Sequence, residues 1–122
     1  MAEPRTVTTK LEFPYTRTLG SIIGGFADGL REGRLLASRS PSGRVMFPPL
    51  EYDPDTSESA EPDMVEVGPG ATVRSWVWVA TPGGRHPVQR PFAFALVQPD
   101  GADTSGVHVV LVDSPDAMST GM

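Results

Sequence analysis

Hydrophobic residues change their spacing along this 122-residue chain. Between residues 19 and 30 they recur every three or four positions, which is the spacing of one face of an α-helix. From residue 64 onward they come in short runs rich in Val, Trp and Phe, separated by Gly- and Pro-rich segments, a pattern typical of β-strands and turns. The chain is therefore expected to be mainly β with an N-terminal helix.

The helix is predicted to run from about Thr18 to Glu32. Thr16 or Thr18 is the candidate N-cap, and Gly33 is the expected stop. Residues 1 to 12 are polar with no clear period, so we expect a loose arm before the helix. The apolar positions of the helix are Leu19, Ile22, Ile23, Phe26 and Leu30.

Four glycines lie in the same helix: Gly20, Gly24, Gly25 and Gly29. Each interior Gly lowers helix stability by about 1 kcal/mol relative to Ala, so packing against another surface must stabilise this helix. The four-residue spacings leave a smooth face that another backbone can approach, and the sequence leaves open whether that surface is the chain's own sheet or a partner. A membrane-dimer helix is excluded, because Asp28, Arg31 and Glu32 lie in the same segment.

Four later runs are predicted to be strands: residues 64–67, 73–80, 92–98 and 107–113. In the second run Trp76 and Trp78 are expected on one face, with Val73, Val77 and Val79 on the other. Both faces are expected to be at least partly covered, as in a small closed barrel. We predict a five-stranded barrel of the OB-fold (oligonucleotide/oligosaccharide-binding) type, although the pattern alone does not exclude a sandwich.

Between helix and barrel, two tight turns, SPSG and DPDT, flank the apolar run VMFPP. In a zinc ribbon each such turn holds a pair of Cys ligands, but this chain has no Cys. The predicted organisation is an N-terminal arm and helix at 1–36, a cysteine-free ribbon hairpin at 37–62 and the barrel at 63–122. We expect no bound metal and no cofactor.

Charge narrows the range of ligands. The formal net charge of −5 argues against a nucleic-acid surface, because such binding needs clustered Lys and Arg. Asp53, Asp55 and Ser57 match the first ligand positions of a calcium loop. However, Glu58 stands where that loop needs Gly and Met64 where it needs a bidentate Glu, so a solvated acidic loop is the better interpretation.

Catalytic groups are few in this sequence. His86 and His108 have no nearby Cys or Gly-flanked Ser that could serve as a nucleophile, so both are expected to be structural. No apolar run approaches the length of a membrane span, and we expect a soluble cytoplasmic protein without an active site of its own. Trp76 and Trp78 are candidates for an aromatic platform that binds a ligand.

Several segments carry a family resemblance. GLREGRLL, GRVMFPP, DPDT, PFAFALVQPDG and the closing VDSPDAMSTGM, in this order, resemble the zinc-ribbon/OB-fold proteins that accompany thiolases. The resemblance runs from about Pro14 to the end, and GRVMFPP and the final GM are its most specific parts. The segment PYTRTLGSIIGGFADGLREGRLL is similar to a subgroup from actinobacterial steroid side-chain degradation, whose partner is a sterol-carrier-type thiolase or aldolase.

The resemblance implies a non-catalytic accessory subunit of a thiolase-fold enzyme, either a retro-aldolase or a thiolase, acting on acyl-CoA thioesters in sterol catabolism. It implies a hetero-oligomer, expected to be a heterotetramer, in which the partner binds most of the acyl-CoA. The expected partner interface comprises Leu19, Ile22, Phe26, Leu30, Phe47 and Pro48. The alternative is a stand-alone OB-fold module that binds single-stranded nucleic acid or acyl-CoA through Trp76 and Trp78.

Two departures from the family pattern affect these expectations. The family's four zinc positions fall on Arg39, Ser42, Asp53 and Thr56, which cannot replace four thiolates. The hairpin is therefore expected to be held by burial of its apolar run and by an ion pair between Arg39 and Asp53. Leu50 stands where the family often has Arg. The family also continues beyond the GM motif into a last barrel strand, so either the chain is truncated or the barrel closes against something else.

Overall fold

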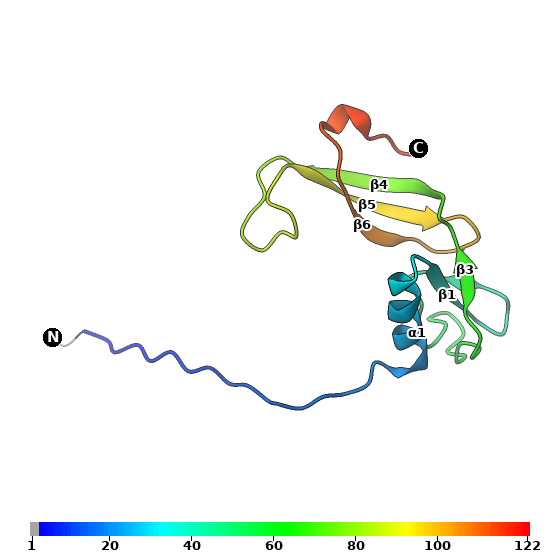
Figure 1. Cartoon of the computed structure of the whole chain (residues 1–122), viewed down its shortest axis with the longest axis horizontal. Helices are drawn as coiled ribbons and strands as arrows, with labels where there is room; N and C mark the ends of the chain where they lie inside the picture. The colour runs from blue at the N-terminus through cyan, green and yellow to red at the C-terminus, as the bar shows by residue number, and fades with distance from the viewer. Residues whose placement is uncertain (1–2) are drawn as a thin grey trace.

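The computed structural model describes residues 3–122, which form one α-helix, two three-stranded antiparallel sheets and one 3₁₀ turn (Figure 1). The expected class, mainly β with an N-terminal helix, is confirmed. The elements are α1 (Gly20–Arg31), β1 (Leu35–Arg39), β2 (Val45–Met46), β3 (Val65–Val67), β4 (Ala71–Val79), β5 (Phe92–Pro99), β6 (Gly106–Val110) and η1 (Pro115–Ala117).

The strands predicted for the barrel are divided between the two sheets. β3 pairs with β1, which also pairs with β2, and together with α1 this sheet forms what we call the helix lobe. β4, β5 and β6 pair in that order and, with the C-terminal segment, form the sheet lobe. The chain passes from β3 to β4 through Gly68 and Gly70, where backbone hydrogen bonds to Asp100 bind the turn to the end of β5.

The ends of α1 differ in how well the sequence predicted them. The predicted N-cap at Thr16 or Thr18 is wrong, because the helix begins at Gly20 with Leu19 as its N-cap, and Leu19 makes no side-chain capping hydrogen bond. At the other end Gly33 adopts a φ of 73°, which lets the N–H of Arg34 donate to the carbonyl of Gly29 at 2.8 Å. The predicted stop at Gly33 is confirmed, because this left-handed conformation favours Gly.

One pair of helix glycines packs against the chain's own lobe. A Cβ added to Gly29 would lie 2.8 Å from Cδ1 of Leu36, and one added to Gly25 would lie 2.8 Å from Sδ of Met64. A Cβ at Gly24 would meet nothing within 4 Å. The spacing of Gly25 and Gly29 therefore serves close packing within this chain, while Gly24 faces open space.

Each lobe has its own hydrophobic core. The helix-lobe core comprises Ala37, Val45, Phe47, Val67 and Ala102, with Phe26, Leu35 and Val65 packed against it. The sheet-lobe core comprises Val73, Ala93, Ala95 and Met118, with Trp76, Trp78, Val97, Val110 and Val112 packed against it. Met118 belongs to the C-terminal segment, so that segment covers one face of the β4–β5–β6 sheet.

The predicted assignment of side chains to the two faces of β4 is wrong for Val73. Val73 was expected opposite Trp76 and Trp78, but all three belong to the sheet-lobe core. The register between β4 and β5 shifts between Val73 and Ser75, and this irregularity breaks the strict alternation of sides that the prediction assumed.

The C-terminal residues also bind the edge of β4. The N–H of Gly121 donates to the carbonyl of Val73 at 2.8 Å, and the N–H of Val73 donates to the carbonyl of Met122 at 2.9 Å. The closing GM motif, which the sequence marked as specific, therefore continues the hydrogen bonding of this sheet.

The two lobes are joined by the loop between β5 and β6, which we call the interlobe latch (residues 100–105). The N–H of Val45 donates to the carboxylate of Asp103 at 2.9 Å, and the N–H of Asp103 donates to the carbonyl of Val45 at 2.8 Å. The hydroxyl of Thr104 accepts from the N–H of Phe47 and donates to the carbonyl of the same residue, at 2.7 and 2.8 Å. The latch fixes β2 of one lobe against the other lobe.

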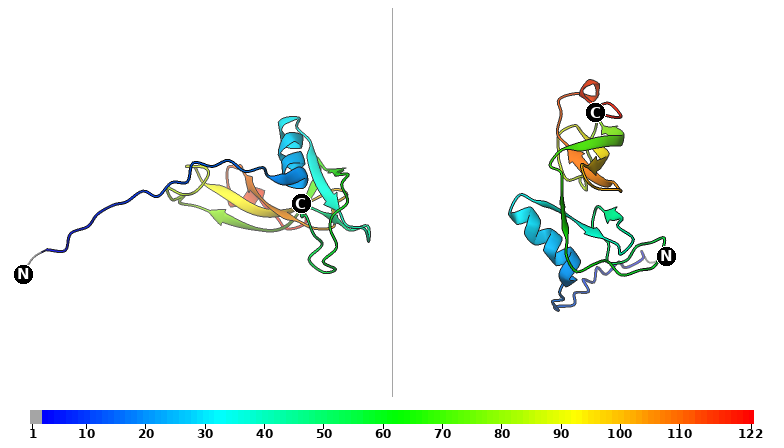
Figure 2. Two further views of the ribbon diagram at one scale, coloured as in Figure 1. Left: turned by 90° about the horizontal axis from the view of Figure 1, so that it is seen from below. Right: turned by 90° about the vertical axis from the view of Figure 1, so that its right-hand side faces the viewer.

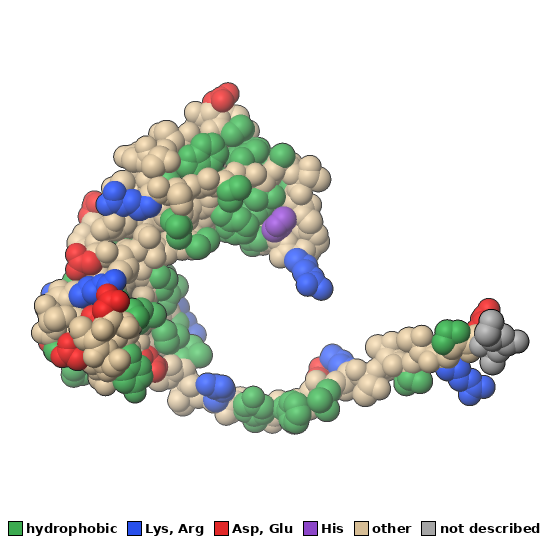
Figure 3. All heavy atoms as spheres, turned by 180° about the vertical axis from the view of Figure 1, so that it is seen from behind, with side chains coloured by type: hydrophobic (Ala, Val, Ile, Leu, Met, Phe, Trp, Pro, Cys, Tyr) green, Lys and Arg blue, Asp and Glu red, His purple; other side chains and the backbone are tan. Residues whose placement is uncertain are grey.

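The arm before α1 leaves the body of the molecule (Figures 1 and 2). Residues 3–19 contain no regular secondary structure and all of them are exposed. Figure 3 shows hydrophobic side chains gathered on the sheet lobe and on the inner side of the helix lobe. Within residues 3–122, no helix has the length and apolar character needed to cross a membrane.

Candidate functional site

The two hairpin turns meet at a buried carboxylate. Asp53 is only 1% exposed, and its Oδ1 accepts the N–H of Asp55 at 2.9 Å. Nη1 of Arg44 lies 3.4 Å from the same oxygen and 2.6 Å from Oδ2 of Asp55. The N–H of Asp55, then the Ser40 hydroxyl and the Arg44 charge, lower the pKa of Asp53 against the opposing effect of burial.

The first turn supplies hydroxyl groups to this polar cluster. Ser40 is fully buried, and its Oγ lies 2.7 Å from Oγ of Ser42 and accepts the N–H of Arg44 at 3.2 Å. Arg39 is exposed, and the ion pair predicted between Arg39 and Asp53 is wrong, because Arg44 is the cation that contacts Asp53. Arg44 follows Gly43 at the end of the turn, and from there its guanidinium lies across the second turn.

The second turn has its own internal hydrogen bonds. Oγ1 of Thr56 accepts the N–H of Glu58 at 3.3 Å, and the carbonyl of Asp53 accepts the N–H of Ser57 at 2.8 Å. Across residues 3–122 there is no group of three or more His, Cys, Asp or Glu placed to hold a metal ion. Hydroxyls, a carboxylate and a guanidinium occupy the place that two metal-binding turns would share.

A groove of about 250 Å³ lies beside this cluster, between the hairpin and the latch. Phe47 is 2% exposed, while Pro48 and Leu50 stand open to solvent. Arg44 provides a cation next to a mostly apolar surface. The lining residues are Arg44, Met46, Phe47, Pro48, Leu50, Pro54, Thr104 and Ser105.

The helix residues predicted for a partner interface have different exposures. Leu19 and Leu30 are 59% and 50% exposed, which leaves both free to contact a partner. Ile22 is buried, and Phe26 packs edge-on against Phe47 with ring centroids 6.0 Å apart, so these three side chains build the chain's own core. The partner contact itself stays a prediction.

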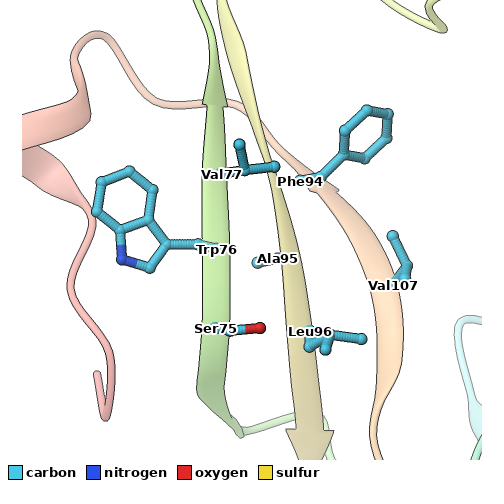
Figure 4. Close-up of a pocket in the computed structure, with 7 residues that line it drawn as sticks. All are labelled: Ser75, Trp76, Val77, Phe94, Ala95, Leu96 and Val107. Carbon is cyan, nitrogen blue, oxygen red and sulfur yellow. The ribbon is translucent and has the colours of Figure 1, made fainter.

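A second hollow, of about 240 Å³, lies on the open face of the β4–β5–β6 sheet (Figure 4). In that view Trp76 projects toward the C-terminal segment, whereas Phe94, Leu96 and Val107 project to the other side. Sequence reasoning missed this surface, because apolar residues on both faces were taken to mean that both faces are covered. The lining residues are Ser75, Trp76, Val77, Phe94, Ala95, Leu96 and Val107.

The aromatic and imidazole groups singled out in the sequence take part in packing. Trp76 and Trp78 are half-buried against the sheet-lobe core. His86 accepts the N–H of Gly83 at its Nδ1 and lies edge-on to Phe92. His108 stacks on Phe47 across the lobe boundary, and its buried Nδ1 has no hydrogen-bond partner among the residues that the structure describes.

Comparison with solved structures gives a fold class, and two of the similar structures are informative. No protein-family model and no curated protein matches this sequence. The chain is similar to the crystal structure of a DUF35-family protein of unknown function from Sulfolobus solfataricus, with a TM-score of 0.66 and 18% identity over 84% of this chain and 73% of that one. Its fold is therefore that of DUF35 proteins.

The second neighbour belongs to an enzyme. The chain is similar to the structure described as Ltp2-ChsH2(DUF35) aldolase, with a TM-score of 0.63 and 22% identity. The match covers 88% of this chain and 83% of that one, so it includes both lobes.

Proposed function

We propose that this chain is a non-catalytic accessory subunit of a thiolase-fold enzyme that acts on acyl-CoA thioesters in sterol catabolism, as a retro-aldolase or a thiolase. The observation that carries the proposal is the fold match to the Ltp2-ChsH2(DUF35) aldolase over 88% of the chain. The family resemblance of GRVMFPP and the closing GM points to the same kind of complex.

The surroundings of the histidines and of the buried carboxylate agree with a supporting role. His86 and His108 both pack against Phe rings, and the polar cluster at Asp53 is internally paired. Such groups stabilise a fold rather than move protons at a substrate. In the proposed complex the partner binds most of the acyl-CoA and supplies the reacting groups.

The proposed contact combines the exposed side of α1 with the groove beside the hairpin. Leu19, Leu30 and Pro48 present apolar surface to solvent, and Leu50 adds to it with 44% exposure. Contiguous exposed apolar surface is typical of protein–protein contacts, so the proposal requires these four side chains to face the same partner. Burial of these residues would also explain why a helix with four glycines is retained at the surface.

The first experiment is co-expression with a candidate thiolase-fold enzyme from the same organism, followed by size exclusion. A single peak containing both proteins is expected, and two separate peaks at micromolar concentration would remove the proposal. Leu30→Asp is expected to abolish the joint peak. Ser21→Asp is the matched control, because residues nine apart on a helix point in opposite directions.

The second experiment is a retro-aldol or thiolysis assay on a steroid side-chain CoA thioester, with the pair and with each protein alone. Activity in the pair only is the expected result. Full activity of the partner alone would contradict an accessory role in catalysis.

No observation favours the alternative of a stand-alone OB-fold module. Trp76 and Trp78, its candidate platform, are half-buried beside Met118. Titration of Trp fluorescence with single-stranded DNA and with acyl-CoA tests it directly, and a flat response to both is expected.

A further inference from the structure

One side of the β4–β5–β6 sheet carries apolar side chains that no other element covers. The register pairs Val77 with Phe94 and Phe94 with Val109, so one apolar row crosses all three strands. Leu96 and Val107 pair in the next row. Apart from Phe94, these side chains are between 38% and 65% exposed. We call the five residues the open strip, and none of them is charged.

Basic side chains stand at both ends of the open strip. Gln98 lies on the same side of β5 as Phe94, and its Oε1 accepts Nε of Arg74 at 2.8 Å. At the other end, the loop between β4 and β5 places His86 edge-on to Phe94, with ring centroids 6.2 Å apart, and Arg85 precedes it. Figure 3 shows basic side chains at two opposite ends of the sheet lobe, with hydrophobic side chains between them. Within residues 3–122, neither Arg74 nor Arg85 makes an ion pair.

The charge of this region is opposite to that of the chain as a whole. Residues 71–99 carry three basic side chains and no acidic one, whereas the whole chain carries ten basic and fifteen acidic residues. The third basic residue, Arg90, lies 3.8 Å from the carboxylate of Asp113, so Arg74 and Arg85 are the cations left for a ligand. A basic region of this kind attracts acidic groups.

The exposed segments of this chain do not match the open strip. The arm is apolar, but Lys10 pairs with Glu12 at 2.6 Å and residues 7–15 carry no net charge. The hairpin segment 51–66 has seven acidic residues, but Tyr52 is its one exposed large hydrophobic residue. Two copies packed strip to strip would bring their arginines together. The complementary occupant is therefore a different molecule with an apolar stripe and acidic ends.

The dimensions of the strip fit one α-helix. The five residue steps of β4 from Arg74 to Val79 span about 17 Å, which equals the length of about 11 helical residues. Three strands spaced about 4.8 Å apart place the outer two about 10 Å apart, close to the diameter of a helix with its side chains. A helix of three turns, aligned with the strands, would cover the strip.

We propose that the open strip binds an acidic amphipathic helix of the partner protein. Its apolar face packs on Val77, Leu96 and Val107, and carboxylates near its two ends pair with Arg74 and Arg85. This inference rests on the proposed function, because the partner is the thiolase-fold enzyme of that complex. It adds a contact on the sheet lobe to the one proposed for the helix lobe. Burial of the apolar side chains supplies affinity, and the charged ends select the helix and its direction.

Isothermal titration calorimetry of the full chain with the purified partner tests the charged ends. Arg85→Glu should raise the dissociation constant by at least about fivefold, and the effect should shrink as salt concentration rises. Arg39→Glu is the matched control, because Arg39 is exposed on the helix lobe and makes no ion pair within residues 3–122. It should change the constant by less than about twofold. Equal effects of the two variants would overturn the proposal.

A variant in the strip itself tests the apolar part. Val107→Ser should raise the dissociation constant by at least about tenfold. Val107 is 65% exposed and lies outside both cores, so its variant should keep the thermal midpoint of wild type.

The outcomes separate this inference from the proposed function. If wild type binds the partner and Val107→Ser binds equally well, the inference fails while the proposed function stands. If wild type does not bind the partner, both fail. Saturable binding of dodecanoate that Val107→Ser abolishes, with partner binding unaffected, would assign the strip to an anionic lipid and would also overturn the inference.

Discussion

Replacing the glycines of α1 one at a time with Ala separates the intrinsic instability of the helix from its packing. At Gly24 the added methyl group meets nothing within 4 Å, and the backbone is helical. Gly24→Ala should therefore raise the free energy of unfolding by about 1 kcal/mol, because Ala has less freedom to lose on folding.

The same change at Gly29 should have the opposite sign. Its new Cβ would lie 2.8 Å from Cδ1 and 2.9 Å from Cγ of Leu36, and 3.3 Å from the carbonyl oxygen of Arg34. Overpacking of this kind lowers stability by about 1–3 kcal/mol, which exceeds the gain of about 1 kcal/mol from helix propensity. The expected net effect is a loss of about 0–2 kcal/mol.

Gly25 should fall between these two positions. The atom that an added Cβ would meet at 2.8 Å is Sδ of Met64, near the end of a flexible side chain that can move aside. Gly25→Ala is therefore expected to leave the stability nearly unchanged, within about 1 kcal/mol.

Urea unfolding followed by circular dichroism measures all three variants, and a change of 1 kcal/mol should move the thermal midpoint by about 4 °C. The expected order of stability is Gly24→Ala, then Gly25→Ala, then Gly29→Ala. A destabilised Gly24→Ala, or a stabilised Gly29→Ala, would refute the assignment of the Gly25 and Gly29 side to internal packing.

Three further predictions concern the latch, the buried carboxylate and the C-terminal segment. Thr104→Val should lower the free energy of unfolding by about 1–3 kcal/mol, because the backbone N–H and carbonyl of Phe47 lose their partner; a change below 0.5 kcal/mol in urea unfolding would contradict this. The pKa of Asp53 is lowered in the folded protein. Its ionised carboxylate therefore stabilises the fold fully above the ordinary pKa of 3.8, and this stabilisation is lost as the pH falls through the lower pKa of the folded state. Wild type should therefore lose more stability than Asp53→Asn in acid unfolding, and parallel pH profiles would count against the effect. Met118→Ala should lower the free energy of unfolding by about 2–3 kcal/mol, because it opens a cavity under β4. An unchanged thermal midpoint would contradict this prediction.

Local chemistry explains what the sequence predicted well. Gly33 ends the helix because the left-handed conformation it needs is favourable for Gly, and no distant residue is required. The later strands follow from short runs of β-branched and aromatic residues between turn residues. Such signals depend only on neighbours in the chain, so they can be seen without the structure.

Features that depend on distant contacts were not predictable in the same way. Asp103 and Thr104 bind residues 58 and 57 positions earlier, and no local pattern marks them as a latch. The shift between Val73 and Ser75 changes which side of β4 faces the core, which strict alternation cannot anticipate. At the hairpin, Asp53 was expected in a solvated acidic loop but is buried, and its cation is Arg44 rather than Arg39 because the turn brings that side chain across.

The latch also limits how the two lobes could have been separated during evolution. Residues 100–105 connect two strands of one lobe, yet their hydrogen bonds complete an edge strand of the other. If recombination replaced either lobe with a foreign sequence, the hydrogen bonds between the latch and β2 would lose one of their two partners. The two lobes are therefore expected to have been passed on together, as one evolutionary unit, despite their separate cores.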